Sequence, residues 1–236
     1  LFEFHTVMRL HRCTPIELLH KIGFLDPEVS LSHCIFISGH SWLAYPYGDD
    51  LKIIADSGAS VAYSPLKYLK LGIVMESFDK YLKAGINMGI GTDTFPKDII
   101  SDMRYASLCS RVAEKSFIAG HPRDVFNAVT LGGAKLVGRD DLGRLQKGAK
   151  ADIAIINLKD IAFGAVRDPI KALVETAVSR DVRTVIVDGE VLVDNGKYLR
   201  LNEEELLDKV QAKGEEVWAS VPKWHWTGKS VDEVLP

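Results

Sequence analysis

Cysteine is scarce in this chain of 236 residues. Cys13, Cys34 and Cys109 are widely spaced and cannot supply a disulfide framework. A reducing compartment, the cytoplasm, is therefore the expected location. Long apolar runs are also lacking, because none approaches the roughly 20 residues that cross a membrane. The sequence thus predicts no membrane partner.

Neither sign of charge is in large excess. Lys and Arg total 29, Asp and Glu total 32, and the formal net charge is -3. No region carries the basic excess that neutralises phosphates, which argues against nucleic acid as a partner. With 47% hydrophobic residues, the composition is that of a globular protein and not of a disordered one.

Several common functional signatures are missing. Gly89 and Gly91 open neither a GxGxxG nor a GxxxxGK pattern, so nothing indicates a phosphate-binding loop. A GxSxG nucleophile elbow is absent, and without CxxC the chain has no zinc-ribbon signature. The remaining candidates for chemistry are polar residues at the ends of predicted strands.

The first part of the chain alternates short apolar runs with helical patterns. Strands are predicted over residues 30–38, 60–65 and 87–93, with helices between and after them. The strand-end residues His33, Ser64 and Asp93 lie about 30 residues apart, the length of one βαβ unit. This repeat predicts a parallel sheet covered by helices, and hence an α/β fold. An open doubly wound sheet and part of a (β/α)8 barrel both fit it.

The pattern changes at Asp140, where glycines and β-forming residues become frequent. Asp188-Gly189 lies between two valine-rich runs and predicts a tight hairpin. We expect an α/β part over residues 1–139, a small β part over 140–200 and a helical tail over 201–236. Asn202 is the predicted N-cap of the tail helix. The tail is rich in tryptophan, so we expect it to pack onto the rest of the chain.

Asp93 is the most informative polar residue. It ends an apolar strand, and polar residues at the carboxyl ends of barrel strands are typical of catalytic sites. Aspartate also favours helix N-caps. However, Phe95-Pro96 and Lys97 separate Asp93 from the helix that is predicted to begin at residue 99, so a functional role is favoured.

His33 is interpreted as lying inside the strand 30–38, on the same face as Leu31 and Ile35. A single histidine in an apolar strand is more often a hydrogen-bonded core residue than a ligand. Its pairing with Asp93 two strands later favours function. We therefore expect the two side chains to meet in one cavity.

Three further residues are candidates for substrate binding. His40 lies in the loop after the first predicted strand, where it could line the same cavity. Lys67 and Tyr68, followed by Lys70, lie in a predicted loop after Pro65, where they could contact an anionic or aromatic ligand. A solvated loop explains the same residues equally well.

Several segments, taken in order, resemble the amidohydrolase superfamily, and within it the cytosine-deaminase and triazine-hydrolase (chlorohydrolase-like) branch. They are TPIELLHKIGFLDPEVSLSHC, SPLKYLKLG, AGINMGIGTD, LGRLQKGAKADIAIINL and TVIVDGEVLV. The resemblance implies that residues 1–139 are the C-terminal part of a (β/α)8 barrel, its strands six to eight. It implies that residues 140–200 belong to a β-sandwich. The family's other metal ligands are then expected upstream of Leu1, in a longer protein.

The resemblance also implies roles for two residues. His33 matches the sixth-strand histidine, which binds metal or orients the attacking water, and Asp93 matches the eighth-strand aspartate, which contacts the metal and shuttles the proton. One divalent metal ion is implied, either zinc, which we favour, or iron. The implied reaction is hydrolytic deamination of a small N-heterocycle (a pyrimidine, purine or triazine) by a homodimer or larger homo-oligomer. Phe36 and Thr94 depart from the family pattern and leave the substrate open.

Two other functions remain as alternatives. One is a catalytically inactive scaffold or ligand-binding protein with the amidohydrolase fold, which has lost the metal. The other is an open-sheet α/β ligand-binding domain in which His33 and Asp93 are an unrelated core residue and helix cap. Side chains of His33 and Asp93 at opposite ends of the sheet would exclude the hydrolase.

Overall fold

The first part of the chain is built around a three-stranded parallel sheet in the computed structural model, which describes residues 1–234. The strands are β1 (Ser30–Ser32), β2 (Ser60–Tyr63) and β3 (Asn87–Ile90), in that order across the sheet. Ser60 lies opposite Ser30 on one side and opposite Asn87 on the other. The predicted α/β fold with a parallel sheet is confirmed.

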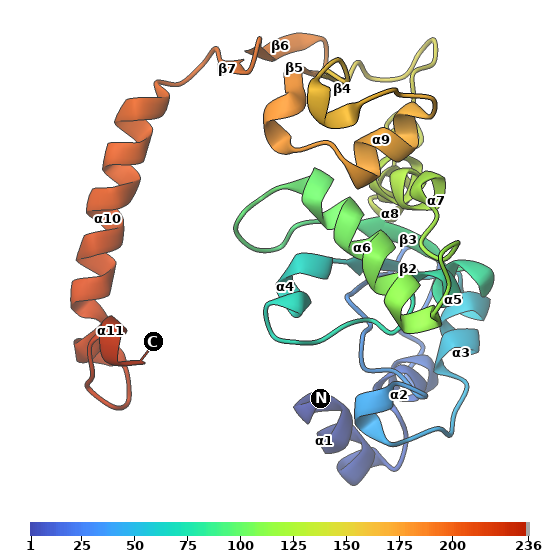
Figure 1. The fold of residues 1–236 in the computed structure, drawn as a ribbon. Coiled ribbons are helices and arrows are strands. Elements are labelled where there is room, and N and C mark those ends of the chain that lie inside the picture. Colours follow the sequence, from blue (N-terminus) through green and yellow to red (C-terminus); the bar gives the residue numbers. More distant parts are fainter. Residues whose placement is uncertain (235–236) are drawn as a thin grey trace.

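Helices lie around these strands in Figure 1. Before and between the strands they are α1 (Phe2–His11), α2 (Pro15–Lys21), α3 (Asp50–Ser57), α4 (Pro65–Leu69) and α5 (Phe78–Lys83). After β3 they are α6 (Ile99–Glu114), α7 (Pro122–Asn127) and α8 (Gly133–Leu136). The middle strand is almost completely buried, with Val61 and Tyr63 no more than 1% exposed. Burial on both faces explains why the strands appear as continuous apolar runs.

All three strands are shorter than predicted. The prediction that His33 lies inside a strand is wrong, because β1 ends at Ser32 and the backbone turns left-handed at His33 (φ 69°) and Cys34 (φ 44°). Ile35 and Ile37 are buried beyond this turn. Their burial in irregular structure produces the apolar run that the sequence analysis assigned to a strand.

The segment after Pro65 is also not the predicted loop. It forms the short helix α4, with Pro65 in its first turn. Proline suits this position because the first helical N–H groups have no partner inside the helix. Lys67 and Tyr68 are therefore held on a helix.

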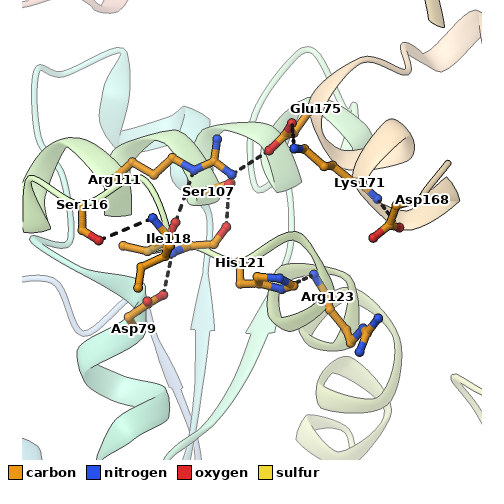
Figure 2. Close-up of polar contacts among 12 residues, drawn as sticks. Asp79, Ser107, Arg111, Ser116, Ile118, His121, Arg123, Asp168, Lys171 and Glu175 are labelled. Carbon is orange, nitrogen blue, oxygen red and sulfur yellow. Dashed lines mark hydrogen bonds and ion pairs between the residues drawn. The ribbon is translucent and has the colours of Figure 1, made fainter. Parts of the chain in front are cut away.

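The connection between α6 and α7 is fastened by polar contacts, which are drawn in Figure 2. The Asp79 carboxylate accepts the Gly120 N–H at 2.9 Å, and Ser107 Oγ donates to the Gly120 carbonyl at 2.6 Å. Arg111 donates to the Ala119 carbonyl and to Glu175 of α9 (Pro169–Glu175). These contacts join α5, α6 and α9 around one buried turn.

Gly120 is the residue of this turn that tolerates substitution least. It has a φ of 59°, and a Cβ there would lie 2.7 Å from Ser107 Cα. We expect Gly120→Ala to lower the free energy of unfolding by at least about 3 kcal/mol, because left-handed strain and a backbone clash add. Gly85→Ala is the control, since Gly85 has a φ of 87° with nothing near its Cβ position. It should lose only about 1–2 kcal/mol, and equal losses in urea denaturation would contradict the clash.

A second sheet follows, with four antiparallel strands in sequence order. They are β4 (Ile153–Ile156), β5 (Val182–Val187), β6 (Glu190–Asp194) and β7 (Lys197–Tyr198). Asp188 and Gly189 both have positive φ values between β5 and β6, as a two-residue hairpin requires. The predicted hairpin is confirmed. This region forms one sheet within the described residues, so the sandwich stays a prediction.

The tail differs from expectation. Asn202 caps α10 (Glu203–Trp224) as predicted, with its side chain accepting the Glu205 N–H at 3.3 Å. However, α10 stands apart from the α/β part in Figure 1 and contacts α11 (Val231–Val234). Trp224 and Trp226 are 64% and 90% exposed. The tail is not packed on the body because the chain leaves β7 in a direction that carries the helix away from it. No helix within residues 1–234 is long and apolar enough to cross a membrane.

Candidate functional site

Three charged or polar side chains meet where the parallel strands end. His33 directly follows β1, Lys67 lies on α4 after β2, and Asp93 follows β3. His33 Nε2 lies 3.3 Å from Asp93 Oδ2, and the Lys67 ammonium forms an ion pair with the same oxygen. The structure thus brings His33 and Asp93 together, which excludes positions at opposite ends of the sheet. It adds Lys67 as a direct partner of the carboxylate.

The backbone is strained at both ends of this contact. His33 has a φ of 69° and Asp93 a φ of 51°, and neither residue is a glycine. A left-handed backbone at a residue other than glycine costs of order 1–3 kcal/mol, and such residues are frequent at functional sites. The His33 N–H donates to the Ala62 carbonyl at 2.7 Å, which fastens this turn to β2. The left-handed turn at His33 thus occurs at the residue whose imidazole contacts Asp93.

The site favours an ionised carboxylate beside a neutral imidazole. The hydrogen bond from Lys67 lowers the pKa of Asp93, and the nearby charges of His33 and Lys97 act in the same direction. Burial lowers the pKa of His33 and Lys67 lowers it further, against the opposite effect of Asp93. A neutral imidazole and an ionised carboxylate are the forms that bind metal ions.

Tyr68 and one face of His33 line a cavity of about 380 Å³ between β1 and helices α1 and α2. The Tyr68 ring meets the imidazole edge-on, with ring centres 4.8 Å apart. His33 Nδ1 is buried and has no hydrogen-bond partner among the described residues. Within this part of the chain, the imidazole ring is therefore oriented by its Nε2 contact with Asp93 and by packing against Tyr68.

His40 lies elsewhere. It is 3% exposed, and its Nε2 donates to the Val74 carbonyl at 2.9 Å while its Nδ1 accepts the Trp42 N–H at 3.2 Å. It lines a separate cavity of about 120 Å³ together with Glu76 and Tyr81. The expectation that His40 lines the cavity of His33 is not met. Both ring nitrogens of His40 are bonded to backbone groups, those of Trp42 and Val74.

This geometry predicts a structural role for His40. His40→Ala would remove a buried side chain and leave the Val74 carbonyl without its donor, so the free energy of unfolding should fall by about 2–4 kcal/mol. His20→Ala is the control, because His20 is exposed on α2 and should change stability by less than about 0.5 kcal/mol. Equal stability of the two variants in urea denaturation would contradict the assignment.

His33 and Asp93 do not form a complete metal site by themselves. No group of three His, Cys, Asp or Glu residues within positions 1–234 is placed to hold a metal ion. The His33 imidazole and the Asp93 carboxylate are donor types that zinc accepts, but catalytic zinc sites use three protein ligands. The pair therefore fits part of a zinc site and needs at least one further ligand.

Sequence reasoning missed two features of the site. It treated Lys67 as a contact for a ligand, whereas the structure pairs it with Asp93. It also passed over Asp102, a fully buried acid on α6 that bonds to the backbone of α4. An acidic residue on the apolar face of a predicted helix is the signal that could have found Asp102.

Comparison with known proteins identifies one family. The model of the amidohydrolase family matches residues 5–192. A 5-methylthioadenosine/S-adenosylhomocysteine deaminase of Halothermothrix orenii is 32% identical over 89% of this chain and 48% of its own length. A 5'-deoxyadenosine deaminase of Methanosarcina barkeri is also 32% identical, over 89% of this chain and 47% of its own. The chain spans about half the length of the curated relatives it matches.

Solved structures show the same fold. Atrazine chlorohydrolase from Arthrobacter aurescens TC1, complexed with zinc, has a TM-score of 0.76 and 28% identity over 89% of this chain and 46% of that one. An adenosine deaminase from Xanthomonas campestris with bound zinc has a TM-score of 0.83 at 20% identity, over 92% of this chain and 48% of that one. The second likeness shows the fold alone.

Proposed function

This chain belongs to the amidohydrolase family, and we propose that it supplies His33 and Asp93 to the catalytic centre of a metal-dependent hydrolase that deaminates an N-heterocycle. The observation that carries the proposal is the 3.3 Å contact of His33 Nε2 with Asp93 Oδ2 at the carboxyl ends of parallel strands. The names of the relatives support a purine nucleoside as the substrate, and the triazine hydrolases keep other heterocycles open. A homo-oligomer in the cytoplasm remains part of the proposal.

Zinc is the proposed metal, because the donor types fit it and the similar atrazine chlorohydrolase is complexed with zinc. When bound, a divalent metal makes water acidic enough to attack at neutral pH. His33 and Asp93 would be two of the ligands, and we place the others in sequence outside this chain. Within residues 1–234 the contribution is thus one imidazole and one carboxylate.

Asp93 carries the proton in this proposal. As an ionised carboxylate it accepts a proton from the attacking water and later delivers it to the departing amine. The water oxygen bonds to the ring carbon, the C–N bond breaks and ammonia leaves. His33 stays neutral, with its Nε2 beside Asp93, and the Tyr68 edge keeps the imidazole from turning.

Asp93→Asn tests the role of the carboxylate. The amide keeps the shape but cannot accept the proton, so turnover should fall by about 10²–10⁴-fold. The readout is ammonia release from purine nucleosides, pyrimidines and triazines by the zinc-loaded protein that contains this chain. Asp98→Asn is the matched control, since Asp98 caps α6 without contacting Asp93, and asparagine caps nearly as well. Unchanged turnover in Asp93→Asn would exclude the residue from the chemistry.

Lys67 should compete with the metal, because both cations need the same carboxylate oxygen. Removing the ammonium in Lys67→Met should tighten zinc binding about tenfold, through lost charge repulsion. Lys70→Met is the control, since Lys70 is on the same segment but bonds to the Phe95 carbonyl. Competition with a chromophoric chelator measures both affinities. Weaker zinc binding in Lys67→Met would mean that Lys67 supports the metal site.

The same ion pair favours a second candidate function, a catalytically inactive scaffold. In such a protein the Lys67 ammonium would neutralise Asp93 permanently, and no metal would be needed for folding. The metal content of the purified protein separates the two. About one zinc per chain supports the hydrolase, and none, even after incubation with zinc, supports the scaffold.

A further inference from the structure

Helix α4 is capped by a side chain from a different helix. Its second residue, Leu66, donates its N–H to Asp102 Oδ1 of α6 at 2.9 Å, across 36 positions of sequence. The N–H groups in the first turn of a helix have no partner inside the helix. A capping acid normally directly precedes the helix that it caps. Ser64, at that position in α4, makes no such bond.

The capped helix is the one that carries two residues of the site. Lys67 and Tyr68 directly follow Leu66 in α4, where Lys67 pairs with Asp93 and Tyr68 meets His33 edge-on. With five residues, α4 is too short to be stable by itself. It lies beside α6 in Figure 1 and packs against it. Its position therefore depends on contacts from α6.

The acid that makes this contact is costly to bury. Asp102 is fully buried, and its second oxygen, Oδ2, has no hydrogen-bond partner among the described residues. Burial raises its pKa to about 6, with Asp98 adding to the rise and Lys70 and the Leu66 N–H opposing it. An apolar residue at this helix position would avoid that cost. Unlike an apolar residue, the carboxylate can accept the hydrogen bond from the Leu66 N–H.

We propose that Asp102 is a positioning residue, which caps α4 from α6 and so holds Lys67 and Tyr68 against Asp93 and His33. This role rests on the proposed function only for its effect on turnover. Its effect on the geometry around His33 does not depend on catalysis.

The decisive comparison is between Asp102→Leu and Asp102→Asn in the protein that contains this chain. Leucine has a similar shape and removes the buried charge, so the fold should survive, but it cannot accept the Leu66 N–H. Asparagine keeps an oxygen for that bond. The NMR signals of the His33 ring should therefore shift in Asp102→Leu and stay as in the unmodified protein in Asp102→Asn. Asp168→Ala is the control, because it removes an acidic cap from a different helix, α9.

Stability against pH identifies the buried acid and also reports folding of each variant. The folded pKa of about 6 lies above the ordinary value of 3.8. Stability from this group is therefore full below about pH 4 and is lost as the pH rises through about 6. Asp102→Asn should remove that part of the pH dependence and raise the melting temperature at pH 8. If stability depended on pH in the same way in Asp102→Asn and in the unmodified protein, Asp102 would not be a carboxylate that is costly to bury.

Turnover gives the last readout. With an accepted heterocycle, Asp102→Leu should lower kcat/KM about tenfold or more, and Asp102→Asn should restore most of it. If no substrate is turned over, the proposed function fails while the NMR comparison still decides the role of Asp102. Unchanged His33 signals in Asp102→Leu, or equal shifts in Asp168→Ala, would overturn the inference.

Discussion

The parallel register of β1, β2 and β3 is the constraint on which the candidate site depends. Ser30, Ser60 and Asn87 lie side by side across the sheet, so all three strands end at one edge. Because each strand ends within four residues of that row, the segments that follow must leave the sheet close together. For this reason His33 and Asp93 meet, although they are 60 positions apart in the sequence.

At this edge of the sheet, a single carboxylate faces two nitrogen-bearing side chains. One carboxylate oxygen of Asp93 faces both the His33 imidazole and the Lys67 ammonium, and all three side chains are partly open to solvent. Lys67 holds the carboxylate ionised and at the same time disfavours protonation of His33. The lysine thus maintains the charge states that a metal ion would select, while it occupies the oxygen that such an ion would bind. In the proposed hydrolase a metal ion would replace the Lys67 ammonium at Asp93, whereas in a scaffold the ammonium would stay.

Three features that lower stability lie around the same edge. His33 and Asp93 have left-handed backbones, and Asp102 buries a carboxylate oxygen without a partner. Each of these features lowers stability, and together they turn an imidazole, a carboxylate and a short helix toward one another. By contrast, the backbone N–H and carbonyl of Gly120 both have side-chain partners, Asp79 and Ser107.

The sequence by itself determined the elements that depend on local patterns. The spacing of apolar runs predicted the parallel sheet, Asp188-Gly189 predicted the hairpin, and Asn202 predicted a helix cap. These signals are readable because backbone sterics and short-range hydrogen bonds act within a few residues. The family resemblance, carried by several ordered motifs, selected His33 and Asp93, and the match over residues 5–192 confirms the family.

Only the tertiary structure decided where the strands end and which polar groups meet. Ile35 and Ile37 are buried without being in a strand, so hydrophobicity alone could not show that β1 ends at Ser32. The placement of His40 away from the site, the pairing of Lys67 with Asp93 and the cap that Asp102 gives to α4 each join residues more than 20 positions apart. Such contacts leave no periodic trace in a sequence, because they depend on how packed helices and strands are oriented in space.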